Sequence, residues 1–238
     1  MFRKTNKGYW EFEEFKKFKN LIHGFSTRLY GDCREEKNCQ NFLKALDLEP
    51  KSLILAQQVH KNKIKAVRDV DRGKIIPGVD GLLTRDWQVV LGIRSADCLP
   101  ILFWEPRAKI IGAAHAGWRG ILARLPQKMV DQMIRMGGLP ENILVAIGPH
   151  ICGKCYSVEK NRLQQFLAEF GRIKGMGKGN CLDLEIPVIN QLFHSGISLS
   201  HIFSASLCTS CDNDEFFSYR KETENTYGEM LSVISLII

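Results

Sequence analysis

The stretch that decides the fold is RSADCLPILFWEPRAKIIGAAHAGWRG, residues 94–120. It holds two apolar runs, CLPILFW and KIIGAAHA, joined by the polar segment EPRA, an order typical of a β-hairpin of two buried strands. With the turn centred between Pro106 and Arg107, antiparallel pairing sets Cys98 directly opposite His115. Directly opposed side chains share one face of a sheet, with Cβ atoms about 4.5–5.5 Å apart. We therefore expect the Cys98 thiol and the His115 imidazole to lie together.

Two kinds of chemistry fit such a pair. A thiol and an imidazole at this separation can be two ligands of one metal ion, or a nucleophile and the base that activates it. An ordinary buried cysteine beside a structural histidine is the plainer alternative. Small residues such as Ala96, Gly112 and Gly117 surround the pair and leave open space, which favours a functional site.

A catalytic zinc site needs three protein ligands and one open position. The best third ligand is His60, which ends the expected strand SLILAQQVH just before a turn. Four other histidines compete on spacing alone, namely His23, His150, His194 and His201. The last two fall in an expected late helix and the strand after it, away from the small-residue opening, so we rank them below the others.

Composition and charge set the outer limits. The 238 residues are 45% hydrophobic and 25% charged, and no linker divides them, so we expect one domain spanning 1–238. The segment MFRKTNKGYWEFEEF contains no apolar signal region, which predicts a cytoplasmic protein. The longest apolar runs have the length of strands, so no membrane partner is expected. A net charge of +7 spread along the chain suits a small anionic substrate and does not favour a nucleic-acid partner.

Strand and helix patterns alternate irregularly along the chain. This order predicts an α+β fold of mixed β-sheets with helices packed outside, without a regular βαβ repeat. Residues 8–20 are expected to form an edge strand that leads into a second strand over 21–28. Helical spacing of apolar residues predicts helices over 39–48, 118–137 with a break at Pro126, 158–170, and 185–196 with Gly196 after its end.

Eight cysteines in a chain without a secretion signal indicate thiols or metal ligands rather than disulfides. Cys152 with Cys155, and Cys208 with Cys211, form two C-x-x-C pairs. If their loops meet, the pairs would make a tetrahedral structural zinc site. A redox pair and unlinked thiols are the competing interpretations.

Six motifs occur in one order along the chain: QQVH, DGLLT, SADCLPILF, AAHAGWRG, AIGPHI followed by CYSV, and FFSYR. Together they make the chain resemble the laccase-domain proteins, a family once named multicopper polyphenol oxidoreductases and described as purine nucleoside phosphorylases with adenosine deaminase activity. The resemblance implies an enzyme of mixed sheets and outer helices. Its implied reactions are phosphorolysis of adenosine, inosine and methylthioadenosine to the free base and a (methylthio)ribose 1-phosphate, and deamination of adenosine.

The resemblance places the family's zinc ligands, which are also its catalytic residues, on His60, Cys98 and His115, the set favoured by the hairpin. Zinc is therefore the expected cofactor, with copper as an alternative occupant. Purine nucleosides and phosphate are the expected partners, and a homodimer stays open. Arg28 and Arg119 are candidates for phosphate contacts because a guanidinium can bind such oxygens in pairs. Asp80 or Asp97 is a candidate to orient a ligand histidine.

The chain also departs from the family pattern. The segment after Arg28 is shorter, which bears on substrate range, and a family T-G-R appears here as Tyr227-Gly228-Glu229, which removes a positive charge. Cys152 and Cys211 are additions that create the two C-x-x-C pairs. Three other functions remain open: a metal-free cysteine hydrolase or deamidase using Cys98 and His115, a metal-binding protein without catalysis, and a laccase-like copper oxidoreductase.

Overall fold

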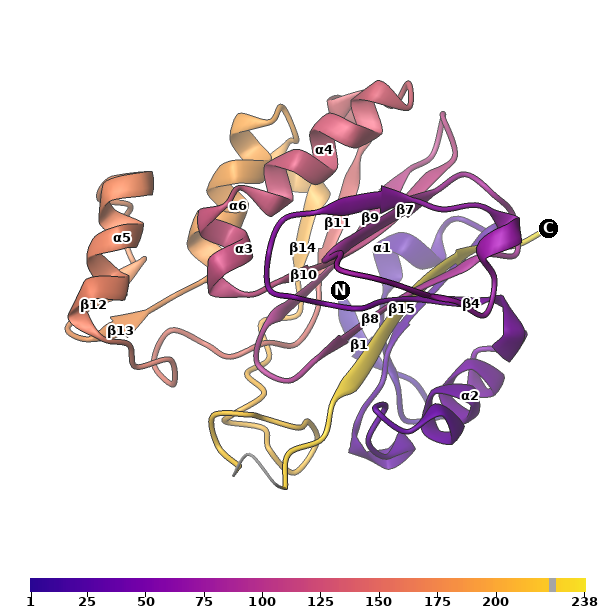
Figure 1. Cartoon of the computed structure of the whole chain (residues 1–238), viewed down its shortest axis with the longest axis horizontal. Coiled ribbons are helices and arrows are strands. Elements are labelled where there is room, and N and C mark those ends of the chain that lie inside the picture. The colour runs from indigo at the N-terminus through magenta and orange to yellow at the C-terminus, as the bar shows by residue number, and fades with distance from the viewer. Residues whose placement is uncertain (223–225) are drawn as a thin grey trace.

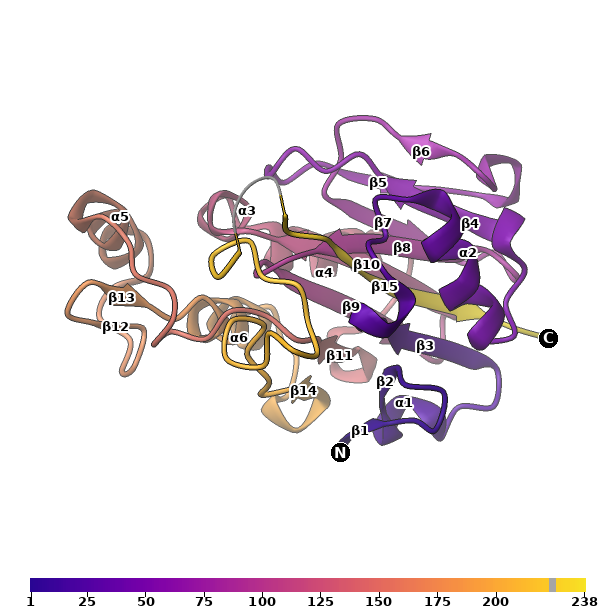
Figure 2. The ribbon, with the colours of Figure 1, turned by 90° about the horizontal axis from the view of Figure 1, so that it is seen from below.

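The computed structural model of the chain describes residues 1–222 and 226–238. Their strands form two mixed sheets that lie face to face, and helices cover the outer side of each (Figures 1 and 2). The larger sheet has seven strands in the order β1-β2-β3-β15-β8-β4-β6. Their bounds are Phe2–Lys4 for β1, Trp10–Phe12 for β2, Leu21–Phe25 for β3, Leu53–Ala56 for β4, Ile75–Ile76 for β6, Val90–Ser95 for β8 and Met230–Leu236 for β15.

The second sheet has six strands in the order β14-β11-β9-β10-β7-β5. Their bounds are Ile64–Ala66 for β5, Gly81–Thr84 for β7, Leu99–Glu105 for β9, Ile110–Ala116 for β10, Leu144–Ile147 for β11 and Ile202–Ser204 for β14. A small ribbon of β12 (Gly177–Lys178) and β13 (Cys181–Leu182) stands apart from both sheets, beside α5 (Figure 1, left). The helices are α1 Glu13–Lys16, α2 Glu36–Ala45, α3 Trp118–Leu122, α4 Leu125–Arg135, α5 Lys160–Phe170 and α6 Glu185–His194.

The space between the sheets is filled by apolar side chains from both of them. Leu91 and Ile93 of β8 meet Leu102 and Trp104 of β9 in one buried cluster. Alternate residues of a strand point to opposite faces, so β9 and β10 send every second side chain into this layer and the others toward the helices. Burying a side chain of this size contributes about 1.5–3 kcal/mol to folding, so this layer holds the two sheets together.

Helices complete the two outer layers. The outer face of β9 and β10 packs against α4 through residues such as Phe103 and Met129, in the largest apolar cluster of the described residues. On the far side, α2 buries Phe42 and Leu43 against Leu231 and Val233 of β15. The expected fold class, mixed sheets with helices outside, is therefore confirmed, as four layers in the order helix, sheet, sheet, helix (Figure 1).

The β9–β10 hairpin forms, but its predicted register is wrong by two residues. His115 pairs with Pro100, rather than with Cys98, because the turn takes four residues instead of two. Lys109, at the end of this turn, has φ of 53°, a left-handed conformation that closes the longer turn. A shift by two preserves the face on which each side chain lies. Cys98 therefore lies diagonally across from His115 on the face that looks toward the other sheet.

The remaining elements follow the sequence pattern with two differences. The expected edge strand over 8–20 is only β2, and α1 takes up the residues after it. The long helix over 118–137 is broken, as expected near Pro126, and left-handed Arg124 separates α3 from α4. Gly196 has φ of 92° after the end of α6, which confirms its place behind that helix. None of the helices in the described residues is long and apolar enough to cross a membrane.

Trp104 offers a test of the layer between the sheets. Its side chain is fully buried, and its indole nitrogen has no hydrogen-bond partner among the described residues. We expect Trp104→Ala to lower the free energy of unfolding by about 3–5 kcal/mol, and Trp104→Phe by only about 1–2 kcal/mol, because the ring alone stabilises the core. Urea unfolding of both variants measures the difference. Equal losses of unfolding free energy in the two variants would mean that the indole N–H makes a stabilising hydrogen bond.

Candidate metal centre and pocket

Three side chains from separate parts of the chain converge at one end of the two sheets. His60 follows β4, Cys98 directly precedes β9, and His115 lies in β10. One ligand atom from each, a ring nitrogen or the sulfur, lies within 4.8 Å of the others. The two imidazole rings stand almost perpendicular, at 89°, with centroids 4.7 Å apart. Two imidazoles and a thiolate are the donor types that zinc binds in proteins.

The buried carboxylate of Asp80 holds two of these side chains in place. Its Oδ1 lies 3.0 Å from His115 Nδ1, which leaves Nε2 of that ring to face Cys98 and His60. The same carboxylate accepts backbone N–H groups of Val59, His60 and Lys61 at 2.8–3.3 Å. A carboxylate on the far nitrogen of a ligand histidine fixes its tautomer and orientation. Of the two aspartates expected to orient a ligand histidine, the contacts single out Asp80.

Backbone conformation and a missing side chain open the site. His60 has φ of 55°, in the left-handed region, and this turn directs its ring toward the other two ligands. A Cβ added at Gly117 would lie 3.1 Å from Cys98 Sγ and 3.1 Å from Cδ2 of His60. Glycine at position 117 therefore leaves room beside the three ligand atoms, and a larger residue would crowd them.

Without a metal ion, the charges of the site favour a thiolate beside an imidazolium. Burial alone would raise the pKa of the Cys98 thiol, but the facing His115 and His60 rings outweigh it and lower this pKa to about 6. Burial likewise opposes the charged form of His115, yet the Cys98 thiolate and Asp80 raise the pKa of this imidazole to about 10. Asp80 keeps a lowered carboxyl pKa because the His115 ring and backbone amides outweigh its burial. In the metal-free centre, the negative Cys98 thiolate and Asp80 carboxylate therefore face the positive His115 ring.

The three residues open into a pocket of about 600 Å³. Its walls come from the ends of both sheets and from the loops beyond them. The lining side chains are Gln57, Gln58, His60, Arg94, Ser95, Ala96, Asp97, Cys98, His115, Trp118, Arg119, Tyr156, Arg162, Tyr219, Arg220, Tyr227 and Glu229. Four guanidinium groups and several aromatic rings in a concave site of this size suit a small anionic ligand with a ring system.

The two arginines expected to contact phosphate lie in different surroundings. Arg119 lines the pocket, and its guanidinium lies 4.4 Å from the centroid of the Trp118 ring. Arg28 is not among the lining residues. It pairs with Glu222 at 2.7 Å and donates to the carbonyl oxygens of Asn213 and Phe216. Arg28 therefore holds the 213–222 segment in place, and these contacts give no support to a role in binding phosphate.

Three further arginines line the pocket that the sequence patterns did not single out, namely Arg94, Arg162 and Arg220. The Arg162 guanidinium lies 4.2 Å from the Trp118 ring centroid and donates to Tyr156 Oη at 3.2 Å. Arg220 is the last residue of the motif FFSYR, so the sequence could have pointed to this arginine through that motif. Arg162 lies in an ordinary amphipathic helix, whose spacing says nothing about what its exposed face meets.

Asp97 holds the loop that carries Arg220. Its Oδ1 accepts hydroxyl groups of Thr209 and Ser218 at 2.6 and 2.7 Å, and its Oδ2 accepts the Arg220 backbone N–H at 2.6 Å. Because all three donors belong to the segment after β14, one carboxylate next to Cys98 fixes that wall of the pocket. Asp97 therefore organises the loop and contacts neither ligand histidine.

Three of the four competing histidines have structural surroundings. His23 is buried and accepts the Phe12 backbone N–H at 2.8 Å, and burial lowers the pKa of this ring to about 3. His150 is buried, with Nδ1 2.9 Å from the Gly148 carbonyl oxygen. The exposed His194 bonds back into its own helix. Among the described residues, the three-ligand group that contains histidine is His60, Cys98 and His115.

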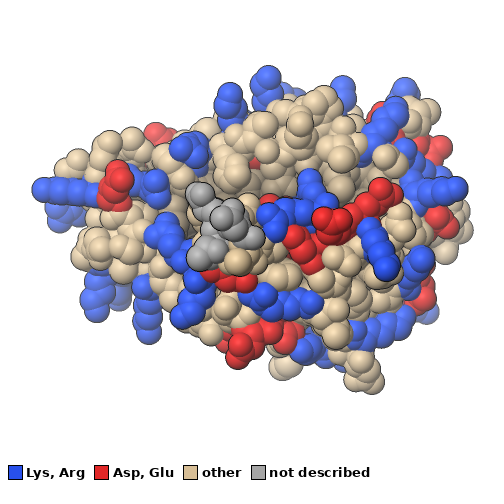
Figure 3. All heavy atoms as spheres, turned by 60° about the horizontal axis from the view of Figure 1, so that its bottom comes forward, with Lys and Arg blue, Asp and Glu red and all other residues tan. Residues whose placement is uncertain are grey.

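Charged side chains do not form one stripe on the surface. Lys and Arg are spread over the face drawn in Figure 3, and Asp and Glu are interspersed among them.

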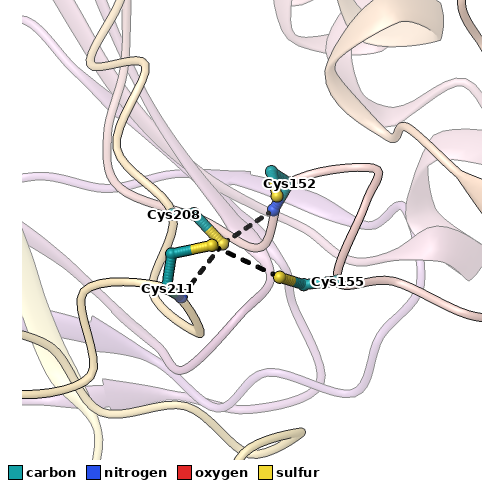
Figure 4. Close-up of side chains that lie close together, drawn as sticks. All are labelled: Cys152, Cys155, Cys208 and Cys211. Carbon is teal, nitrogen blue, oxygen red and sulfur yellow. Dashed lines mark hydrogen bonds between the residues drawn. The ribbon is translucent and has the colours of Figure 1, made fainter.

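Separately, the four cysteines of the C-x-x-C pairs do meet: Cys152, Cys155, Cys208 and Cys211 have sulfur atoms within 4.8 Å of one another and could hold a metal ion (Figure 4).

Comparison with known proteins gives this fold and site a family. Residues 27–237 match the family model described as multi-copper polyphenol oxidoreductase laccase, so the chain belongs to this family. The resemblance that the sequence motifs carried is thereby confirmed.

Its relatives include named enzymes. Purine nucleoside phosphorylase YlmD of Geobacillus stearothermophilus is 37% identical over 195 residues, which cover 76% of this chain and 71% of the relative. Adenosine deaminase RL5, from an unknown prokaryotic organism, is 30% identical over 190 residues, 74% of this chain and 72% of the relative. The crystal structure of YlmD from Geobacillus stearothermophilus superposes with a TM-score of 0.89 at 29% identity, covering 100% of this chain and 99% of that one.

Removing the charge of Asp80 should weaken metal binding at the three-ligand centre. We expect Asp80→Asn to lower the zinc affinity of this centre about 10–100-fold, because His115 loses the carboxylate that orients it. Titration of metal-free protein against a zinc-buffering chelator measures the affinity. Glu105→Gln is the matched control, since Glu105 is a buried carboxylate at the far end of the same hairpin. Unchanged affinity in Asp80→Asn would contradict the role given to this carboxylate.

The lowered pKa of Cys98 predicts how the metal-free thiol reacts. A thiol with a pKa of about 6 is ionised at pH 7, so alkylation of Cys98 by iodoacetamide should stay fast at pH 7 and slow only below about pH 6. Free N-acetylcysteine should already slow below about pH 8.5. Peptide mapping after timed alkylation gives the rate at Cys98. Added zinc should protect it, and an ordinary pH profile would refute the thiolate–imidazolium pair.

Proposed function

We propose that the protein is a zinc-dependent purine nucleoside enzyme. It would phosphorolyse adenosine, inosine and methylthioadenosine to the free base and a (methylthio)ribose 1-phosphate, and would also deaminate adenosine. The observation that carries this proposal is the set of His60, Cys98 and His115 at the floor of a pocket lined by arginines and aromatic rings. Relatives named purine nucleoside phosphorylase and adenosine deaminase support it.

The donor set supports zinc as the metal. Two imidazoles and one thiolate make a three-ligand site with a fourth position open to the pocket, the arrangement of catalytic zinc centres. Zinc bound in this way acts as a Lewis acid and lowers the pKa of water. Around it, Asp80 keeps the His115 ring oriented, and Gly117 leaves the ligands uncrowded. Copper binds the same donors more tightly and would compete for the site.

For phosphate, we propose Arg119 and Arg162 as the main contacts. Both guanidinium groups lie over the Trp118 ring, at 4.4 and 4.2 Å from its centroid, so the indole stacks them in place at the pocket wall. The Arg162 Nε is buried and has no hydrogen-bond partner among the described residues, so its N–H is left to donate to a ligand oxygen. Guanidinium pairs of this kind bind phosphate oxygens with fixed geometry.

For the nucleoside, aromatic and hydroxyl groups line the rest of the pocket. Tyr219 and Tyr227 stand edge to face with centroids 5.1 Å apart, and their rings offer a flat surface to a purine. The Ser95 hydroxyl is buried at the pocket without a partner among the described residues. We assign it to a ribose hydroxyl, because a buried polar atom left unpaired costs free energy until a ligand satisfies it.

Glu229 bears on phosphate affinity. It lines the pocket at the position where the family pattern led us to expect a positive charge, and its Oε2 lies 3.6 Å from Arg94 Nε. A carboxylate here opposes an incoming anion and shields one guanidinium. We expect Glu229→Gln to lower the KM for phosphate roughly two- to fivefold with kcat little changed. Phosphorolysis rates at varied phosphate measure this, and a raised KM would contradict the assignment.

A second candidate function rests on the same contacts. The Cys98 thiolate, the His115 ring and the Asp80 carboxylate follow the order of a nucleophile, its base and the group that orients the base. A metal-free hydrolase or deamidase would use Cys98 in this way. Tight zinc would block it, because a thiolate bound to zinc is a weak nucleophile.

One assay decides between the two functions. Adenosine is incubated with zinc-loaded protein, with and without phosphate, and the products are separated by chromatography. Adenine that forms only with phosphate would establish phosphorolysis, and inosine would establish deamination. Unchanged adenosine in both samples would refute the proposal.

Variants of His60 tie the activity to the metal centre. We expect His60→Ala to abolish both products while the protein stays folded, because the ring is exposed and its loss removes a ligand rather than core packing. His60→Asn is a second variant that suits the left-handed backbone, since asparagine adopts this conformation readily. Circular dichroism checks the fold of each. Full activity in both variants would remove the metal centre from the reaction.

A further inference from the structure

Two loops far apart in the sequence leave the six-stranded sheet side by side. β11 and β14 pair in parallel, with Ile147 opposite Ser204, so their following loops emerge at the same edge. The pairing continues past the strands, since His150 and Cys208 form a further parallel bridge. This topology carries the segment of Cys152 and Cys155 against the segment of Cys208 and Cys211.

The four sulfur atoms of this cysteine cluster point toward a common centre (Figure 4). They lie within 4.8 Å of one another, and Sγ of Cys155 and Sγ of Cys211 are 3.4 Å apart. A tetrahedral zinc ion with Zn–S bonds of about 2.3 Å needs sulfur atoms about 3.8 Å apart. The shortest distance given, 3.4 Å, lies below this value, and the 4.8 Å that bounds every pair lies above it, so the cluster has the size that a zinc ion needs.

Backbone amides around the cluster also suit bound thiolates. Cys208 Sγ accepts the backbone N–H of Cys152 at 3.2 Å and that of Cys211 at 3.4 Å. Such N–H···S contacts stabilise a negative sulfur and fix its direction. Four thiolates this close repel one another unless a cation lies between them. Cys211 is exposed and Cys208 buried, so an ion would sit near the surface with a path from solvent.

We propose that Cys152, Cys155, Cys208 and Cys211 bind a structural zinc ion, separate from the three-ligand centre. All four positions of a tetrahedral ion would be filled by protein, which leaves none for a reaction. The ion would join the loop that leads to Tyr156 to the loop that carries Arg220, two parts of the pocket wall. The proposed zinc therefore holds together a wall that is built from loops rather than strands.

The most direct test measures the number of zinc ions per chain in the purified protein. We expect Cys211→Ser to contain about one zinc ion fewer per chain than the unaltered protein, with Tm lower by about 5 °C or more. Cys181→Ser is the matched control, because Cys181 is half-exposed nearby, with its sulfur 3.7 Å from the Lys154 carbonyl oxygen, yet lies outside the cluster. It should keep the full zinc content. Equal zinc in Cys211→Ser and the unaltered protein would overturn the proposal.

Cobalt distinguishes this site from the three-ligand centre, even if Cys211→Ser does not fold. Cys98→Ser removes the single thiolate of that centre, so any thiolate-to-cobalt charge-transfer absorption left in cobalt-loaded Cys98→Ser comes from the cysteine cluster. We expect a strong band of this kind whether or not the enzyme turns over nucleosides. Its absence would overturn the proposal. A Cys155–Cys211 disulfide, seen by intact mass and alkylation under non-reducing conditions, would overturn it too.

Discussion

The candidate site depends on the buried carboxylate of Asp80. It accepts hydrogen bonds from the His115 ring and from three successive backbone N–H groups, those of Val59, His60 and Lys61. A single group thereby links the loop after β4, in one sheet, to β10, in the other. Its cost is the burial of a full negative charge, which is offset by four hydrogen bonds and by the cationic character of His115. The end of the sheet sandwich is thus held by polar contacts where its apolar core stops.

That position explains why chemistry collects there. Along β9 and β10, the face toward the other sheet carries Leu102, Trp104 and Ala113. At the open end of the strands the same face carries Cys98 and His115 instead. Beyond the last apolar pair the sheets no longer cover each other, and loops supply the arginines and tyrosines of the pocket. A rigid core thus presents its ligands to a wall made of loops, a division common to binding sites on rigid scaffolds.

The sequence predicted the metal centre more completely than it predicted the pocket. Period-two alternation placed Cys98 and His115 on one face, and this survived a register error of two residues because such an error leaves faces unchanged. The partners of Arg28 were out of reach, since Glu222 and the carbonyls of Asn213 and Phe216 come from the far end of the chain.

The outer helices and the cysteine pairs show the same limit. Helical spacing predicted α2, α4, α5 and α6 well, because each has a buried stripe that depends on local sequence. Whether the two C-x-x-C loops meet depends instead on the parallel pairing of β11 and β14, which no local pattern encodes.

The placement of β15 has a consequence for how the chain reaches this state. β15 lies between β3 and β8, two strands that precede it by most of the chain, and bonds to both. During synthesis the two halves of the seven-stranded sheet, β1-β2-β3 and β8-β4-β6, therefore cannot be joined until β15 has left the ribosome. Until then the apolar face of α2 lacks Leu231 and Val233 of β15, the side chains that cover it in the folded protein. Long-range pairing of this kind slows folding and makes the sandwich depend on strands that lie far apart in the sequence.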